Sequence, residues 1–266
     1  MQGLETGPLH RFQDWPNEQV PSGAAGVYVY TVWDGDRRPV SVARGPRGVP
    51  CGTAKRERPD VRMSQGANEM ARVVIQAVVS VDGYIAYPDD TVGPLFDWYG
   101  NGEVTVHVND KWPFHVSRAS ADYVQPFWDA IKVTVIGRHL FDTTDGWAGV
   151  PAAGDELVVV THRPLPEEWL ARFPDAPFHT ADSVEAAITL AKELAGDGLI
   201  CVTAGDVGGQ AFSAGLVDEV AMDVAPVVLG EGVRFFGSHT GTVLLDDPDV
   251  VIQGDRVLHL HYTVKR

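Results

Sequence analysis

The chain has 266 residues, of which 44% are hydrophobic and 21% charged, a balance typical of a globular protein with a sizeable core. Its formal net charge of −15 argues against nucleic-acid binding as the main role, because contacts with phosphates require basic surface. No apolar run approaches the roughly 18 residues that span a bilayer, no signal pattern opens the chain, and two cysteines are too few for a disulfide framework, so we expect a cytoplasmic protein without a membrane partner.

The first 70 residues differ in character from the rest. They hold nine of the 21 basic residues but only eight of the 36 acidic ones. The segment GVYVYTVW at 26–33 alternates like a strand and resembles the opening strand of GIY-YIG nuclease domains. Neither the second motif of that family nor its catalytic arginine follows, so we interpret 1–33 as a short remnant of such a strand. Residues 34–70 are rich in Pro, Gly and basic side chains and are predicted to be a flexible linker.

From Ala71 the chain alternates between strand-like and helix-like segments. The β-branched run at 73–79 is typical of a strand buried on both faces. We predict strands over 73–79, 128–136, 156–160, 199–202 and 217–224, helices over 183–195 and 209–215, and an antiparallel hairpin over 252–264. This order predicts an α/β domain over 71–266, with a mixed, mostly parallel central sheet and helices on both faces.

Three strand ends carry residues that suit phosphate groups, because glycines expose backbone N–H groups and arginine offers a bidentate fork. They are, in chain order, Gly137-Arg138-His139, Thr161-His162-Arg163 and Gly205-Asp206-Val207-Gly208-Gly209. Each by itself has an equally ordinary interpretation: an arginine paired with a carboxylate, a polar loop, or a sharp corner. Together, at strand ends of one sheet, they favour a dinucleotide site.

Asp82 and Asp97 are the candidate proton donors, with water as the third candidate. Asp82 lies in the loop after the first strand, where it either holds a turn or faces a substrate. Asp97 belongs to an aromatic stretch at 93–102, in which Trp98 and Tyr99 are predicted to form part of a substrate wall. For Trp98, a place in the core is the alternative.

Several stretches of 71–266 together resemble the dihydrofolate-reductase-like superfamily. They are VSVDGYIA, VIGRHLFD, VVVTHRP and AGDVGGQAFSAGLVDEVAMDVAPVVLGEGVRFF. Within that superfamily the chain is most similar to the C-terminal reductase domain of the bifunctional riboflavin-biosynthesis deaminase-reductase and its stand-alone bacterial relatives. The resemblance implies a three-layer fold, NADPH as cofactor, hydride transfer to a small-molecule substrate, and a homodimer. The zinc motif of the deaminase is absent from the sequence, and we expect no metal site.

The resemblance also implies a place for each part of the cofactor. Ala77 and Ile85 would border the nicotinamide. Gly137, Arg138 and His139 would contact phosphate groups. Thr161 and Arg163 would contact the adenosine 2′-phosphate. The pyrophosphate would be bound by Gly205, Asp206, Val207, Gly208 and Gly209.

The leading interpretation is an NADPH-dependent reductase of a small heterocyclic or carbonyl compound, of the 5-amino-6-(5-phosphoribosylamino)uracil reductase type. The alternative is a non-catalytic nucleotide-binding protein that retains the fold, with Trp98 and Tyr99 filling the cavity. The preference for NADPH over NADH rests on Thr161 and Arg163.

Overall fold

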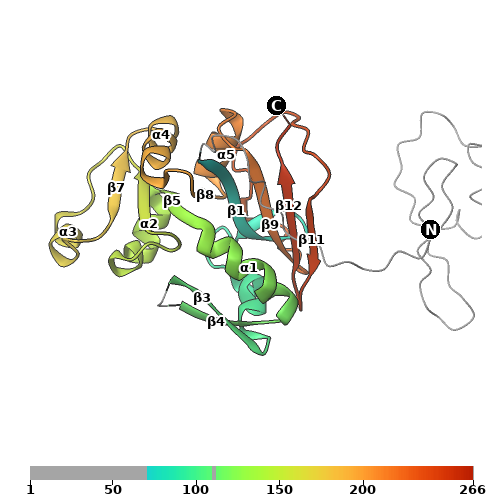
Figure 1. Ribbon diagram of the computed structural model, residues 1–266. Helices are drawn as coiled ribbons and strands as arrows, with labels where there is room; N and C mark the ends of the chain where they lie inside the picture. The colour runs from blue at the N-terminus through green and yellow to red at the C-terminus, as the bar shows by residue number, and fades with distance from the viewer. Residues whose placement is uncertain (1–70, 110–111, 266) are drawn as a thin grey trace, which may run out of the picture. The chain divides into compact units, whose positions relative to one another are not determined.

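The strand β1 (Arg72–Ser80) lies at the centre of an eight-stranded sheet in the computed structural model, which describes residues 71–109 and 112–265 (Figure 1). The predicted segments 1–33 and 34–70 lie outside the described residues. The order across the sheet is β11 (Val250–Gln253), β12 (Leu258–Thr263), β9 (Glu219–Ala225), β1, β8 (Leu199–Thr203), β5 (Ile131–Gly137), β6 (Glu156–Val160) and β7 (Phe178–Ala181).

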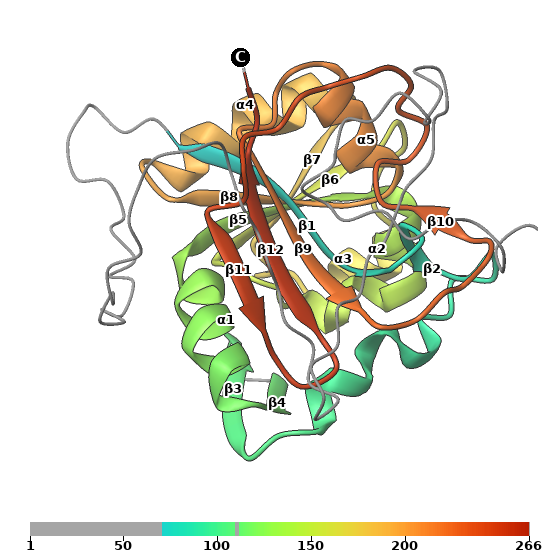
Figure 2. The ribbon, with the colours of Figure 1, turned by 90° about the vertical axis from the view of Figure 1, so that its right-hand side faces the viewer.

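The strands from β9 to β7 are all parallel. The C-terminal strand β12 runs antiparallel to β9, and β11 pairs antiparallel with β12 in a hairpin (Figure 2). This confirms the predicted mixed, mostly parallel sheet with a C-terminal hairpin. β1 suits a central position because it carries apolar side chains on both faces. Val73, Val74 and Ile75 are all fully buried, so both faces of the strand are covered.

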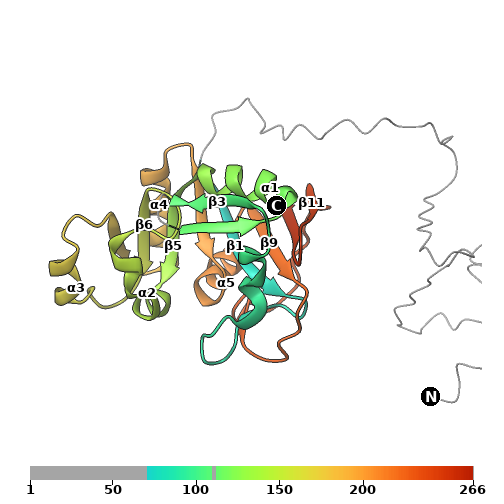
Figure 3. The same ribbon diagram turned by 90° about the horizontal axis from the view of Figure 1, so that it is seen from below.

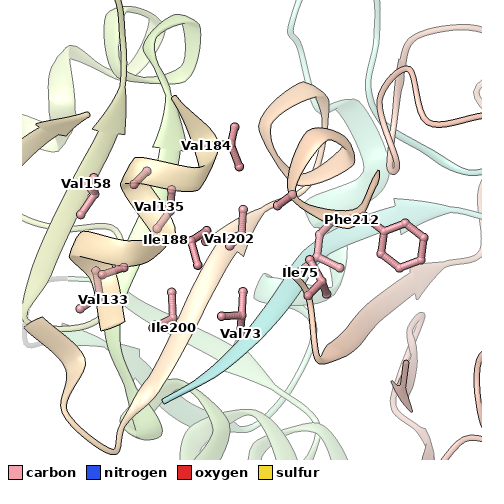
Figure 4. Packing of buried hydrophobic residues seen from close by; sticks show 14 of the residues in the cluster. Val73, Ile75, Val133, Val135, Val158, Val184, Ile188, Ile200, Val202 and Phe212 are labelled. Carbon is pink, nitrogen blue, oxygen red and sulfur yellow. The ribbon is translucent and has the colours of Figure 1, made fainter. Parts of the chain in front are cut away.

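Helices cover both faces, which gives three layers. The helices α4 (Val184–Ala195) and α5 (Asp206–Ser213) lie on one face. The other face is covered by α1 (Arg118–Ala130), α2 (Arg138–Thr144), α3 (Glu167–Arg172) and the 3-10 helices η2 (Gly93–Gly100) and η4 (Asp145–Gly149). Figure 4 shows the core on the first face, where Val73 and Ile75 of β1 lie in one cluster with residues of α4 and α5. Val74 points the other way, toward α1 and η2, because successive side chains of a strand alternate.

Two small antiparallel sheets complete the fold. The hairpin β3 (Val104–Val108) and β4 (Trp112–Val116) lies beside α1 (Figures 1 and 3). β2 (Tyr84–Ala86) pairs with β10 (Val233–Arg234), which brings the loop after β1 next to the segment after β9 (Figure 2). In 71–109 and 112–265, no helix is long and apolar enough to cross a membrane.

Two predicted boundaries are wrong. The strand predicted over 128–136 begins only at Ile131, because its first three residues are the end of α1. That helix is capped by the preceding Ser117, whose hydroxyl accepts a hydrogen bond from the Ser120 N–H. The helix predicted over 209–215 begins at Asp206 and ends at Ser213, so Gly208 lies inside α5 rather than in a turn. The helix predicted over 183–195 is confirmed as α4.

Candidate functional site

The parallel order β8, β5, β6 brings the three phosphate-compatible turns to one edge of the sheet. Gly137 ends β5, Thr161 follows β6, and Gly205 follows β8. Gly137 also lies against α5, because a Cβ added to it would be 3.0 Å from Cγ2 of Val207. The structure therefore brings together the residues that the sequence predicts for a dinucleotide.

The glycines at the start of α5 are explained by packing against protein. A Cβ on Gly208 would lie 2.6 Å from the carbonyl oxygen of Thr203, and one on Gly209 would lie 2.1 Å from the carbonyl oxygen of Phe236. Gly205 has a φ of 98°, which favours glycine, and its N–H donates to the carbonyl of Phe235 at 2.9 Å. These glycines let α5 approach β8 and the segment after β10, and their contact with a pyrophosphate stays a prediction.

What α5 offers to a ligand is its first turn of backbone N–H groups. Asp206 is exposed and Val207 is half-buried, while the glycines on either side are buried. Among the described residues no side chain caps this helix end. The carboxylate of Asp206 accepts a hydrogen bond from Gln210 Nε2 at 2.9 Å, within the helix. A helix start with free N–H groups is a suitable place for an anion.

Arg138 holds the loop that follows β6. Its side chain is only 15% exposed; Nε donates to Oδ1 of Asp142 at 2.7 Å, and Nη1 donates to the carbonyl of Pro164 at 2.9 Å and to that of Arg163 at 3.2 Å. These donors are committed to the protein, as expected for the alternative in which the arginine pairs with a carboxylate. We therefore assign Arg138 a positioning role.

The loop after β6 leaves one arginine toward solvent. The hydroxyl of Thr161 donates to the carbonyl of Arg163 at 2.8 Å, which closes a turn. The Arg163 side chain is 68% exposed and donates from Nη2 to Oδ2 of Asp142 at 3.0 Å. His139, also predicted to contact a phosphate, is exposed at the start of α2, with Nε2 2.7 Å from Oδ2 of Asp90.

Ala77 and Ile85, the predicted nicotinamide neighbours, lie on the α5 side of the sheet. Both are partly buried against the core cluster that includes α5. Cδ1 of Ile85 would be 3.4 Å from a Cβ on Gly205. Ile85 therefore lies beside the start of α5, and the contact of both residues with a nicotinamide stays a prediction.

Asp82 is a loop clamp. Its carboxylate accepts hydrogen bonds from the Ser80 hydroxyl at 2.6 Å, from the Leu229 N–H at 3.1 Å and from the Gly230 N–H at 2.7 Å. The Ser80 hydroxyl and these N–H groups hold the Asp82 pKa below its ordinary value. A carboxylate stabilised in its charged form is a poor proton donor, so the turn-holding interpretation of Asp82 applies.

The aromatic stretch of η2 is divided between core and surface. Trp98 is 1% exposed and belongs to the core, as the alternative interpretation has it, while Asp97 is exposed. The ring of Tyr99 lies between those of Trp98, at a centroid distance of 4.2 Å, and Phe114, at 4.4 Å. Burial raises the pKa of the Tyr99 phenol. Of the predicted substrate wall, only the half-buried Tyr99 has an exposed part.

A buried polar chain beneath α1 was not predicted. Nδ1 of His259 is 2.6 Å from Oδ1 of Asp223, and Nε2 of His259 is 2.9 Å from the Ser120 hydroxyl. The second oxygen of Asp223 accepts from Gln76 Nε2 at 2.9 Å. A carboxylate within the apolar run of β9 is the signal that could have indicated such a partner.

A half-open cavity of about 350 Å³ lies at the opposite edge of the sheet, where β5 begins. Its lining includes Gln125, Trp128 and Lys132. It is therefore separate from the edge at which the three turns meet.

The residues in 71–109 and 112–265 contain no group of three or more His, Cys, Asp or Glu arranged to hold a metal ion.

A sequence family and several solved structures are similar to this chain. The sequence model of the family described as the RibD C-terminal domain matches residues 107–250, more than half of the chain. No curated protein matches.

Three solved structures are each similar over 74% of this chain. A putative riboflavin biosynthesis protein from Shewanella sp. PV-4 is 20% identical and covered completely, with a TM-score of 0.49. RibD of Acinetobacter baumannii is 16% identical, covered to 58%, with a TM-score of 0.48. A diaminohydroxyphosphoribosylaminopyrimidine deaminase/5-amino-6-(5-phosphoribosylamino)uracil reductase from Thermotoga maritima is 12% identical, covered to 57%, with a TM-score of 0.47. The chain thus spans less than two thirds of the last two proteins.

Proposed function

Because this chain belongs to the RibD C-terminal domain family, we propose that it is an NADPH-dependent reductase of a small heterocyclic or carbonyl compound. Within that class we propose the pyrimidine reductase type, which acts on 5-amino-6-(5-phosphoribosylamino)uracil. The observation that carries the proposal is the meeting of the turns after β8, β5 and β6 at one edge of the sheet.

The residues at this edge fit a dinucleotide in part. The uncapped start of α5 suits the pyrophosphate, and the exposed guanidinium of Arg163 suits the 2′-phosphate. Asp142 and Asp206 bring negative charge to the same edge. In a chain of net charge −15, binding of a polyanion depends on such local donors.

Each residue then has a definable task. The N–H groups of Asp206 and Val207 would bind the pyrophosphate, Ala77 and Ile85 would border the nicotinamide, and Arg138 would keep the loop after β6 in place. The cofactor supplies the hydride, and the protein supplies its orientation. Since the Asp82 carboxylate is engaged by the Ser80 hydroxyl and by the N–H groups of Leu229 and Gly230, we assign the proton to water or to Asp97.

Binding of NADPH, measured by calorimetry, is the first test. Arg163→Ala removes a charge-assisted contact with the 2′-phosphate, and we expect NADPH to bind about tenfold more weakly while NADH binding stays unchanged. Arg172→Ala is the matched control, because Arg172 is also exposed, to 55%, and pairs with Asp145 at 2.7 Å. A folded wild type that binds neither dinucleotide would overturn the proposal.

A second candidate function is nucleotide binding without catalysis. The stack of Tyr99 between Trp98 and Phe114 favours it, because these rings occupy space that a planar substrate would need. Oxidation of NADPH upon addition of the pyrimidine substrate distinguishes the two: turnover supports the reductase, and binding without turnover of any tested heterocycle supports the second candidate. We also propose a homodimer, which a measurement of mass in solution tests.

A further inference from the structure

One carboxylate joins the two arginines of the predicted phosphate edge. Asp142, in the last turn of α2, accepts from Arg138 Nε at 2.7 Å through Oδ1 and from Arg163 Nη2 at 3.0 Å through Oδ2. Its own side chain is 38% exposed, so it is reached by solvent and by ligands.

The two arginines differ in how firmly they are held. Arg138 has three further acceptors, the carbonyls of Arg163 and Pro164 and the Thr161 hydroxyl, and it is largely covered. The Arg163 guanidinium is exposed and pairs with the carboxylate of Asp142. The Asp142 carboxylate thus engages Nη2 of Arg163, a donor that a bound phosphate would also use.

We propose that Asp142 is a specificity-determining residue that weakens the preference for a 2′-phosphorylated dinucleotide by competing for Arg163. This inference rests on the proposed function. A phosphate that binds Arg163 must displace the carboxylate, and it must then remain close to its negative charge. A dinucleotide without the 2′-phosphate needs no such exchange and is bound equally well with or without Asp142.

The variant Asp142→Asn separates the two roles of this carboxylate, which are to hold Arg138 and to compete for Arg163. Its amide oxygen still accepts from Arg138 Nε, so the loop after β6 keeps its anchor, while its NH2 group cannot accept from Arg163. The matched control is Asp145→Asn, which removes the same charge from another carboxylate paired with an arginine, Arg172.

The experiment measures dissociation constants of NADPH, NADH, adenosine 2′,5′-bisphosphate and 5′-AMP for the wild type and both variants. We expect Asp142→Asn to bind NADPH and the 2′,5′-bisphosphate about three- to tenfold more tightly, a gain that high salt reduces because the site is exposed to solvent. NADH and 5′-AMP should bind as to the wild type, and Asp145→Asn should bind all four as the wild type does. In an Arg163→Ala background, Asp142→Asn should give no gain.

The outcomes separate this inference from the proposed function. An equal gain for all four ligands, weaker NADPH binding, or a gain that persists without Arg163 would overturn the role of Asp142. If neither protein binds a dinucleotide but Asp142→Asn tightens the 2′,5′-bisphosphate alone, the role of Asp142 stands and the reductase proposal fails. If no ligand binds to either protein, both are overturned.

Discussion

His259 and Asp223 form a hydrogen-bonded pair in the interior, with 2.6 Å between Nδ1 and Oδ1 and no exposed surface on the imidazole. The pair joins neighbouring strands β12 and β9, and it reaches α1 through Ser120 and β1 through Gln76. One chain of hydrogen bonds therefore links β1, β9, β12 and α1, and the packing of these four elements depends on its remaining intact.

Replacing His259 by Leu leaves the Asp223 carboxylate buried without its partner. We expect the free energy of unfolding, measured in urea, to fall by about 3–5 kcal/mol. The matched control is His139→Leu, which breaks a His–Asp pair at 2.7 Å whose histidine is 77% exposed, and its cost should stay below about 1 kcal/mol. A double variant that also changes Asp223 to Leu should regain much of the loss; an equal loss in the single and double variants would contradict this account.

Glu219 and His261 should make stability depend on pH in two opposite directions. Burial alone would raise the Glu219 pKa, but the bonds from His261 and Arg72 hold it below its ordinary 4.5. Burial alone would lower the His261 pKa, but Glu219 and Asp249 keep it above its ordinary 6.5. The contribution of Glu219 is therefore present above pH 4.5 and is lost as the pH falls through its lowered pKa. That of His261 is present below pH 6.5 and is lost as the pH rises through its raised pKa.

Unfolding free energies across this pH range check the signs. In His261→Gln, the decline that begins above pH 6.5 should be reduced relative to the wild type. A decline of the same size in both proteins would exclude His261 as its source.

Gly209→Ala should destabilise the start of α5. The new Cβ would lie 2.1 Å from the carbonyl oxygen of Phe236, a backbone atom that can move only with its segment. We expect a loss of about 1–3 kcal/mol in unfolding free energy, together with weaker NADPH binding. Gly100→Ala is the control, because a Cβ there meets nothing within 4 Å, and it should change stability by less than about 0.5 kcal/mol. Equal effects of the two changes would contradict the packing explanation.

Asp82→Asn tests whether this residue is a clamp or an acid. As a clamp, the carboxylate protects the N–H groups of Leu229 and Gly230, so both should exchange hydrogen faster in the variant. The pH dependence of NADPH oxidation should keep its shape. Loss of one limb of that profile, with unchanged hydrogen exchange, would instead assign Asp82 to the proton transfer.

The sheet was predictable because its strands are strongly β-branched and its helices alternate with them. α4 followed from Ser183 and the apolar spacing after it, and the structure shows the Ser183 hydroxyl accepting from the Ala186 N–H. α1 was missed: its sequence contains Pro126, and its buried face consists of a few spaced residues such as Val124 and Trp128.

The convergence of the three turns was predictable from strand order alone, but their chemistry was not. Arg138 pairs with Asp142 four residues along α2, but it also donates to two carbonyls of another loop, and nothing in its own sequence neighbourhood indicates those. The atoms that approach Gly209 come from the chain near Phe236, and only tertiary structure brings these segments together. Sequence patterns report local geometry, whereas these contacts depend on residues far away along the chain.

The central place of β1 has a consequence for how the protein is made. Its first residue, Arg72, pairs with Leu199, and the neighbour on its other side is β9, so both partner strands leave the ribosome more than 120 residues later. Until then the apolar run from Val73 to Val79 has no sheet to join and remains a hazard for aggregation. Closing such distant pairs is slow, and folding of this domain should therefore be late and should benefit from chaperones that cover β1 during synthesis.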